Sequence, residues 1–238
     1  MNVLNRNINN VFFIFALSHL IVWTLVPSIT NNNLPLDTIE ALAWGSNLDW
    51  GFNKHPPMSA FFLEVFYKIF GDQDWAYYLL SQIFVLIAFY YVFKFANEIL
   101  GSISLALISI LLLTSIYFYN FTTPEFNVNV CQLPFWSMVV YYSWRIYDSK
   151  EIKLSDCLLV GIFAAIGFLS KYLFIYLLIS VDLLFIYLIF FKKAKKFDFK
   201  YLISLEVFLV LLVPHFIWLY DNEFITIFYG LKRTGLEE

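Results

Sequence analysis

The chain consists largely of long apolar runs separated by short polar segments. Of its 238 residues, 61% are hydrophobic and 14% are charged, whereas about 25% of the residues of a soluble domain are charged. Apolar runs of roughly 18 residues or more are typical of transmembrane helices, because a helix satisfies its own backbone hydrogen bonds in lipid. We therefore expect an all-α, multi-pass transmembrane helical bundle that forms a single domain over residues 1–238.

The pattern predicts about seven spans and one shorter surface helix. The spans are expected at residues 11–29, 75–95, 103–119, 128–147, 155–170, 172–191 and 201–219. Between the first two, apolar residues recur at positions i, i+3, i+4 and i+7 from Met58 to Phe70. At 1.5 Å per residue this helix is about 20 Å long. It is too short to span, and we expect it to lie at the membrane interface within a first outer loop at 30–74.

The lysine and arginine residues favour one orientation of the chain. If the N-terminus is cytoplasmic, ten of these residues lie on the cytoplasmic face and five on the other. An excess of positive charge inside is typical of membrane proteins, so we expect the first loop to lie outside. The sequence has no basic stripe for a duplex, and we expect no nucleic-acid partner.

The first loop contains two acids and an aromatic residue at helical spacing. Asp37, Glu40 and Trp44 stand at i, i+3 and i+7, so they share one face if a helix begins after Pro35. A partly buried carboxylate pair beside an aromatic ring suits general-base catalysis. The alternative is an acidic first turn that complements the helix dipole.

Cationic residues stand at three other places on the predicted outer face. Lys54 and His55 precede two prolines and either bind a lipid phosphate or anchor the loop at the interface. Lys171 separates two predicted spans, where it either holds an anion or extends its ammonium group to water. Arg233 in the C-terminal tail contacts either a phosphate or water.

Glu125, Asn127 and Asn129 stand at the second predicted outer loop, residues 120–127, and directly after it. They either line the same cavity as Asp37 or are solvated. The two cysteines, Cys131 and Cys157, are expected near opposite faces and lack metal-ligand spacing. No glycine-rich phosphate loop or serine-hydrolase motif is present, which argues against nucleotide-driven chemistry and serine hydrolysis. We expect no cofactor and identify no metal ligands, and the sequence leaves a requirement for a divalent metal undecided.

Three segments resemble one family of membrane enzymes. DTIEALAWG…LDWGFNKHPP before an amphipathic helix, GFLSKY at 167–172, and WLYDNEFITIFYGLKRTG at 218–235 are similar to GT-C membrane glycosyltransferases. The most similar branch holds the lipid A aminoarabinose transferase, the galacturonosyl transferases of lipopolysaccharide core and the protein O-mannosyltransferases. The resemblance implies transfer of a hexose or pentose from a polyprenyl-phosphate donor, usually with inversion, on the outer (periplasmic) face of the inner (plasma) membrane. The acceptor is lipid A, lipopolysaccharide core, another glycan, a lipid or a protein.

The resemblance also implies roles for particular residues. Asp37 stands where family members have an acid that acts as base or positions the acceptor hydroxyl. Thr38 stands where many members have a second acid, so Glu40 is the nearest substitute. The implied donor-phosphate ligands are Lys54, His55 and Lys171. From their positions we add Arg233 to these ligands and expect Trp44, Glu125 and Asn127 to be acceptor or pocket residues. Members with lipid-monophosphate donors generally need no metal.

Two other hypotheses stand beside the glycosyltransferase. Family members are commonly about twice as long, so the chain is also interpreted as a short homologue, an N-terminal portion or an inactive truncated homologue. A transporter of lipid or of a small molecule is the alternative of a different class. Transporters often have repeated halves and charges near the membrane midplane, whereas here no repeat is visible and the polar residues gather on one predicted face.

Overall fold

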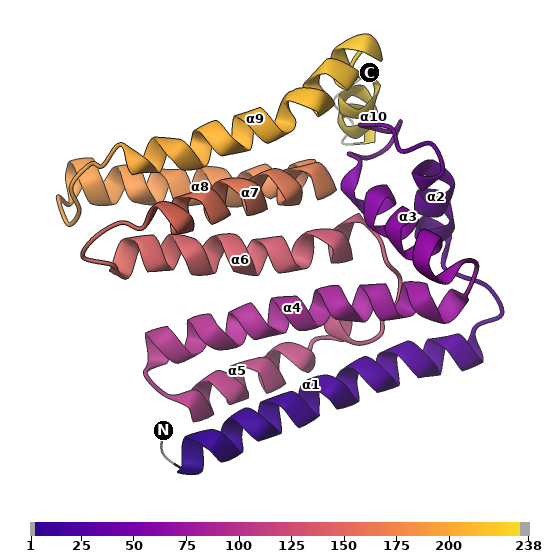
Figure 1. Cartoon of the computed structure of the whole chain (residues 1–238), viewed down its shortest axis with the longest axis horizontal. Helices are drawn as coiled ribbons and strands as arrows, with labels where there is room; N and C mark the ends of the chain where they lie inside the picture. The colour runs from indigo at the N-terminus through magenta and orange to yellow at the C-terminus, as the bar shows by residue number, and fades with distance from the viewer. Residues whose placement is uncertain (1–2, 234–238) are drawn as a thin grey trace.

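The computed structural model describes residues 3–233, which form a bundle of helices with no strand among them (Figure 1). The longer helices are α1 (Val3–Thr30), α4 (Asp74–Leu100), α5 (Ile103–Thr114), α6 (Val128–Asp148), α7 (Leu154–Ser170), α8 (Ile175–Ile186) and α9 (Lys200–Asp221). A π-helical turn, η3 (Tyr187–Phe191), extends α8, and two short 3-10 turns are η1 (Tyr117–Tyr119) and η2 (Tyr172–Phe174). Three short helices complete the set: α2 (Leu36–Gly45), α3 (Met58–Phe70) and α10 (Ile225–Arg233).

The longer helices lie side by side and alternate in direction. Helix α6 packs between α4 and α7, α1 and α5 cover the outer side of α4, and α9 covers α7 (Figure 1). The three short helices α2, α3 and α10 gather at one end of this bundle, where α1 and α9 finish and α4 and α6 begin. We call this end the loop end, and the end where α4 and α6 finish the opposite end.

The membrane bundle predicted from the apolar runs is confirmed, but fewer spans than predicted are supported by length and composition together. Among the described residues, four stretches are long and apolar enough to cross a membrane: Ile8–Thr30, Asp74–Leu100, Tyr172–Phe191 and Lys200–Asp221. Helices α5 and α7 are apolar but have only 12 and 17 residues. Helix α6 has 21 residues and includes Asn129, Gln132 and Arg145. That these three helices cross the membrane stays a prediction.

The predicted third span, 103–119, was too long. Helix α5 ends at Thr114 because neighbouring side chains compete for its last carbonyl groups. The hydroxyl groups of Thr114 and Ser115 donate to Leu111 O at 2.9 Å and Leu112 O at 2.6 Å. The amide of Asn120 donates to Thr114 O, and η1 follows instead of a further helical turn.

Helix α3 has the predicted bounds, and its faces explain why it lies beside α2. Its buried residues include the small Ser59 and Ala60 together with Leu63 and Glu64. A Cβ added at Gly45 of α2 would lie 2.8 Å from Ala60 O, so the two helices approach closely because both residues are small. The predicted apolar stripe is divided, because Met58, Phe62 and Phe66 pack against the core whereas Val65 and Ile69 are 53% and 65% exposed. The exposed part is free to face lipid, as expected for an interfacial helix.

Candidate active site

One face of α2 lines a small pocket at the loop end. The helix begins directly after Pro35, as predicted, and Asp37, Glu40 and Trp44 all line this pocket. The other walls come from His55, Ser59 and Asn127, with Ala41 and Val128. The prediction that the three α2 residues share a face is therefore confirmed. The hydroxyl of Ser59 is fully buried here and has no hydrogen-bond partner among the described residues.

The second polar loop is attached to the start of α2. The carboxylate of Glu125 accepts a hydrogen bond from the backbone N–H of Asp37 at 3.2 Å, and Asn127 donates to the other Glu125 oxygen at 3.5 Å. The buried hydroxyl of Thr38 donates to Phe126 O at 3.1 Å. Burial, and to a lesser degree the nearby Asp37 charge, raises the pKa of the Glu125 carboxyl. The carboxyl group that joins Asp37 thus comes from a segment 88 residues away.

Glu40 has a different partner. Its carboxylate accepts a hydrogen bond from Lys54 Nζ at 2.5 Å, which raises the pKa of Lys54. The ring of Trp44 stacks on Phe52 at 5.4 Å between centroids and meets the edge of His55 at 5.9 Å. The face of α2 therefore holds the loop that carries Lys54 and His55, and the Glu40 carboxylate is already occupied by a cation.

The four cationic residues predicted at separate places converge on this end. Burial lowers the pKa of His55, the charges of Lys171 and Arg233 lower it further, and Asp37 and Glu40 oppose them. Burial also lowers the pKa of Lys171, again with a contribution from Arg233. The ammonium group of Lys171 donates to Asn129 Oδ1 in the first turn of α6. The charges of His55, Lys171 and Arg233 therefore act on one another, whereas Lys54 interacts with the acids Glu40 and Asp37. Binding of phosphate by these residues stays a prediction.

The residues that clamp the first loop were not predicted. His215 of α9 is fully buried, and its ring nitrogens form hydrogen bonds with Trp50 O at 2.6 Å and Tyr172 Oη at 2.7 Å. Because a carbonyl oxygen only accepts, Nδ1 carries the proton and Nε2 accepts from Tyr172 in the neutral ring. The hydroxyl of Thr226 in α10 donates to Phe52 O at 2.5 Å. A histidine inside an apolar run was the available signal, since polar residues in spans are rarely accidental.

The ring of Trp218 completes this clamp. A Cβ added at Gly51 would lie 2.3 Å from that ring, so only glycine allows the loop to run beneath it. Both cysteines are buried and free. Within residues 3–233 no three side chains of His, Cys, Asp or Glu are grouped closely enough to hold a metal ion.

A comparison with known families gives a match over most of the chain. The model of the dolichyl-phosphate-mannose-protein mannosyltransferase family matches residues 54–218. No curated protein and no solved structure matches. The matched range includes Lys54, His55, Glu125, Asn127 and Lys171, and it begins after the acids of α2. Together with its membrane bundle, this match shows that the chain belongs to the dolichyl-phosphate-mannose-protein mannosyltransferase family of membrane glycosyltransferases.

Proposed function

We propose that this protein transfers a sugar from a polyprenyl-phosphate donor to an acceptor hydroxyl on the outer face of the membrane. The observation that carries the proposal is the arrangement at the loop end. The carboxylates of Asp37 and Glu40 line a small pocket with His55 and with the Ser59 hydroxyl, which has no partner in the described structure. Glu125 is bonded to the backbone of Asp37, and the charges of Lys171 and Arg233 act on His55. Family membership supplies the reaction class.

Asp37 is the proposed general base. Its side chain is exposed and lines the pocket, whereas Glu125 is partly buried and bonded to the backbone of Asp37. Asp37 takes the proton of the acceptor hydroxyl while the acceptor oxygen bonds to the anomeric carbon. The bond from that carbon to the phosphate oxygen breaks, and polyprenyl phosphate leaves with the electron pair. Glu125 positions Asp37, and Glu40 positions Lys54 through their 2.5 Å ion pair.

The cations are the proposed site for the donor phosphate. The positive charges of Lys171 and Arg233 repel each other, and both lower the pKa of His55. A bound phosphate would relieve this repulsion and gain charge-assisted hydrogen bonds. Fixed cations would also stabilise the negative charge that develops on the leaving phosphate, and such preorganised groups are usually a large part of catalysis. Trp44 and Asn127, on the acid side of the pocket, are proposed to contact the acceptor or the sugar.

The distribution of basic residues supports the proposed orientation. Segment 192–200, which joins η3 to α9 at the opposite end, contains five lysines, and Arg145, Lys150 and Lys153 flank the turn between α6 and α7. The loop end carries fewer basic residues. By the positive-inside tendency, we place the N-terminus in the cytoplasm and the site on the outer, periplasmic face of the inner (plasma) membrane.

The test begins with the lipids that copurify with the full chain. Mass spectrometry of an organic extract of the purified protein is expected to find a polyprenyl-phosphate sugar, and its sugar is expected to appear on lipid, glycan or protein acceptors in membranes that contain the protein. Asp37→Asn is expected to retain the donor and lose transfer. Asp72→Asn, which changes an exposed acid in the turn before α4, is the matched control and is expected to transfer normally.

Two results would overturn this proposal in different ways. Transfer that persists in Asp37→Asn would show that another group is the base. A wild-type protein that retains no polyprenyl-phosphate sugar and transfers none would contradict the donor class.

A further inference from the structure

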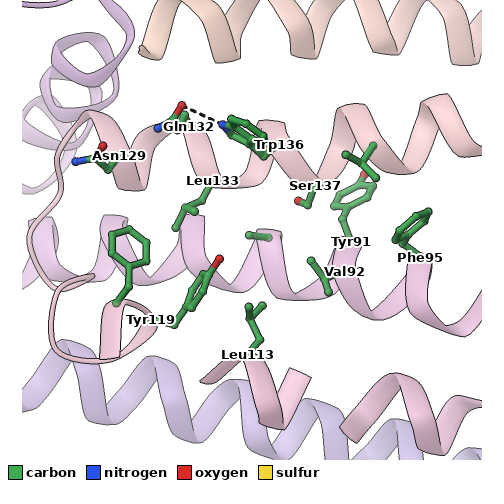
Figure 2. A pocket seen from close by; sticks show the side chains of 13 residues that line it. Tyr91, Val92, Phe95, Leu113, Tyr119, Asn129, Gln132, Leu133, Trp136 and Ser137 are labelled. Carbon is green, nitrogen blue, oxygen red and sulfur yellow. Dashed lines mark hydrogen bonds between the residues drawn. The ribbon is translucent and has the colours of Figure 1, made fainter. Parts of the chain in front are cut away.

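A larger cavity lies between α4, α5 and α6, away from the small pocket of α2. Its volume is about 560 Å³, within the range of roughly 300–1,000 Å³ that is typical of ligand sites. Figure 2 shows Val92 and Phe95 of α4, Leu113 of α5 and Leu133 of α6 facing this space. It follows α6 from Asn129 to Val140, which corresponds to about 16 Å of helix. The cavity is therefore long enough for part of an extended hydrocarbon chain.

The walls of this cavity are mostly apolar and its polar groups are neutral. Its described lining residues include no charged side chain. The polar groups deeper in the bundle are already bonded, since Ser137 donates to Pro134 O at 2.8 Å and Tyr91 meets Tyr142 at 3.4 Å. Nearer the loop end, Gln132 accepts from Trp136 at 3.0 Å (Figure 2), which leaves its amide N–H groups available. The cavity is thus mostly apolar at depth and carries the amide groups of Asn129 and Gln132 towards the loop end.

Asn129 connects this cavity with the candidate active site. Its side chain lines the cavity, and its Oδ1 accepts the hydrogen bond from Lys171. Its backbone N–H donates at 2.9 Å to Asn127, whose side chain lines the Asp37 pocket and bonds Glu125. The polar end of the cavity therefore meets the acid side of the site at the start of α6.

We propose that the cavity holds the hydrocarbon chain of a lipid acceptor, whose neutral, hydroxyl-bearing head lies between Asn129 and Asp37. This inference rests on the proposed function and narrows its acceptor to a lipid. The surrounding membrane supplies lipids with hydrocarbon chains, and the apolar walls of the cavity fit such a hydrocarbon chain. Neutral amide and hydroxyl groups suit a hydroxyl, ester or amide head. The donor phosphate requires cations, and none of the four proposed phosphate ligands lines this cavity, although Lys171 bonds Asn129 at its polar end. The acceptor hydroxyl must reach the proposed base, Asp37. The polar end of the cavity meets the candidate active site on the side where Asp37 lies.

The test is photo-cross-linking of the full chain in nanodiscs. The probe is a monoacylglycerol with a diazirine in its acyl chain, and labelled peptides are mapped by mass spectrometry. We expect saturable labelling of the α4 and α6 segments around Ala88–Phe95 and Asn129–Val140. Unlabelled monoacylglycerol is expected to compete, and polyprenyl monophosphate is not. Competition by polyprenyl monophosphate would assign the cavity to the donor, and labelling that does not saturate would show no specific site. Either result overturns the inference.

Matched variants separate occupancy of the cavity from general damage. Ala88→Phe fills the cavity from α4 and is expected to reduce labelling by about tenfold or more, because two buried methylene groups carry that much affinity. Ile108→Phe introduces the same aromatic side chain at an exposed site on α5 and is expected to label normally. If Ala88→Phe does not fold, the wild-type competition result still decides. Equal labelling of folded Ala88→Phe and wild type would overturn the inference.

Failure of this inference and failure of the proposed function have different signatures. Asp37→Asn is expected to label like the wild type while transfer is lost. Transfer by a wild-type protein that shows no saturable labelling would remove the lipid-acceptor inference alone. Saturable labelling of a protein that retains no polyprenyl-phosphate sugar and transfers none would remove the proposed function and leave a lipid site.

Discussion

The two ends of the bundle both carry many charged side chains, but they use them differently. At the opposite end, Arg145 pairs with the buried Asp156 at 3.3 Å, and Lys94 lies over the Tyr141 ring at 4.6 Å. Lys195 and Lys200 donate to backbone carbonyls at 2.8 Å and 3.0 Å. At the loop end, Lys171 and Arg233 repel each other, burial and these charges lower the pKa of His55, and Ser59 has an unpaired hydroxyl within the described structure.

This difference teaches that charge alone does not mark a site. At the opposite end, Arg145, Lys94, Lys195 and Lys200 close the ends of helices and join neighbouring segments through partners within the protein. At the loop end Lys54 is paired with Glu40, but His55 and Lys171 are brought near Arg233 at a cost in burial and repulsion that lowers the pKa of both. An incomplete group of this kind is where a ligand gains most. The predictions below test that distinction by matched changes at the two ends.

The largest effect is expected for the loss of Lys171. In Lys171→Met the donor phosphate loses a charge-assisted hydrogen bond, which is typically worth about 1.5–3 kcal/mol, so the donor KM should rise by about ten- to a hundredfold. Thermal stability should be unchanged or higher, because a desolvated lysine near Arg233 has been removed. The control is Lys94→Met at the opposite end, which should lower stability slightly and leave the donor KM unchanged. Equal donor KM values in Lys171→Met and wild type would contradict the phosphate assignment.

A second comparison adds one methyl group at each of two crowded glycines. In Gly51→Ala the new Cβ would lie 2.3 Å from the Trp218 ring, and in Gly161→Ala it would lie 2.6 Å from Ser204 O where α7 meets α9. Both changes overpack the protein and should cost about 1–3 kcal/mol in the free energy of unfolding. Only Gly51→Ala should also raise the donor KM, because it displaces the loop before Lys54 and His55. A similar rise in Gly161→Ala would show that the effect is general destabilisation.

The ion pair of the opposite end should affect stability alone. Arg145→Met leaves the carboxylate of Asp156, which is 3% exposed, without its cation. We expect the free energy of unfolding to fall by about 1–3 kcal/mol, towards the lower value because the Arg145 side chain is 32% exposed. Thermal unfolding in detergent measures this loss, and Lys150→Met, at an exposed position, is the control. Impaired donor binding by the folded variant would break the distinction between the two ends.

The smallest effect is a pH dependence that His55 should confer. Its pKa is lowered from the ordinary value, chiefly by burial, so the unfolded chain takes up a proton first as the pH falls. Without donor, stability should therefore be highest above pH about 6.5 and should decline below it. With the donor bound, stability should instead increase as the pH falls, because a phosphate favours the protonated ring. The donor KM should fall severalfold as the pH is lowered through the same range. His55→Gln should lose both trends, and a wild-type profile in that variant would refute this role.

The regular elements were predictable because they depend on local patterns. Helix α3 has the predicted bounds, and the shared face of Asp37, Glu40 and Trp44 follows from helical spacing. The end of α5 was missed because side-chain hydrogen bonds at Thr114 and Ser115 outweighed apolar continuity. The apolar runs predicted seven spans. By length and composition, however, α5 and α7 are too short and α6 is too polar to be identified as spans.

The partners of the site residues could not be predicted from spacing. Asp37 and Glu40 were expected to form the carboxylate pair, but Glu40 is paired with Lys54 and the second carboxylate beside Asp37 is Glu125. Thr38 has no carboxyl group, and its hydroxyl attaches α2 to the segment that brings in Glu125. The hydrogen bonds of Asp37 with Glu125 and of Thr38 with Phe126 each join residues 88 positions apart, so they depend on how the helices pack.

The amino-acid sequence by itself determined that the chain forms a membrane bundle, where its main polar loop lies, and which face of α2 carries its acids. Apolar length and helical period are properties of neighbouring residues, and they do not need the rest of the fold. Only the tertiary structure decided that Glu125, Lys171, His215 and Arg233 meet at that loop, and that a cavity beside α6 reaches it through Asn129. Packing of α4, α6, α7 and α9 sets those distances, because side chains far apart in the chain meet only when whole helices align.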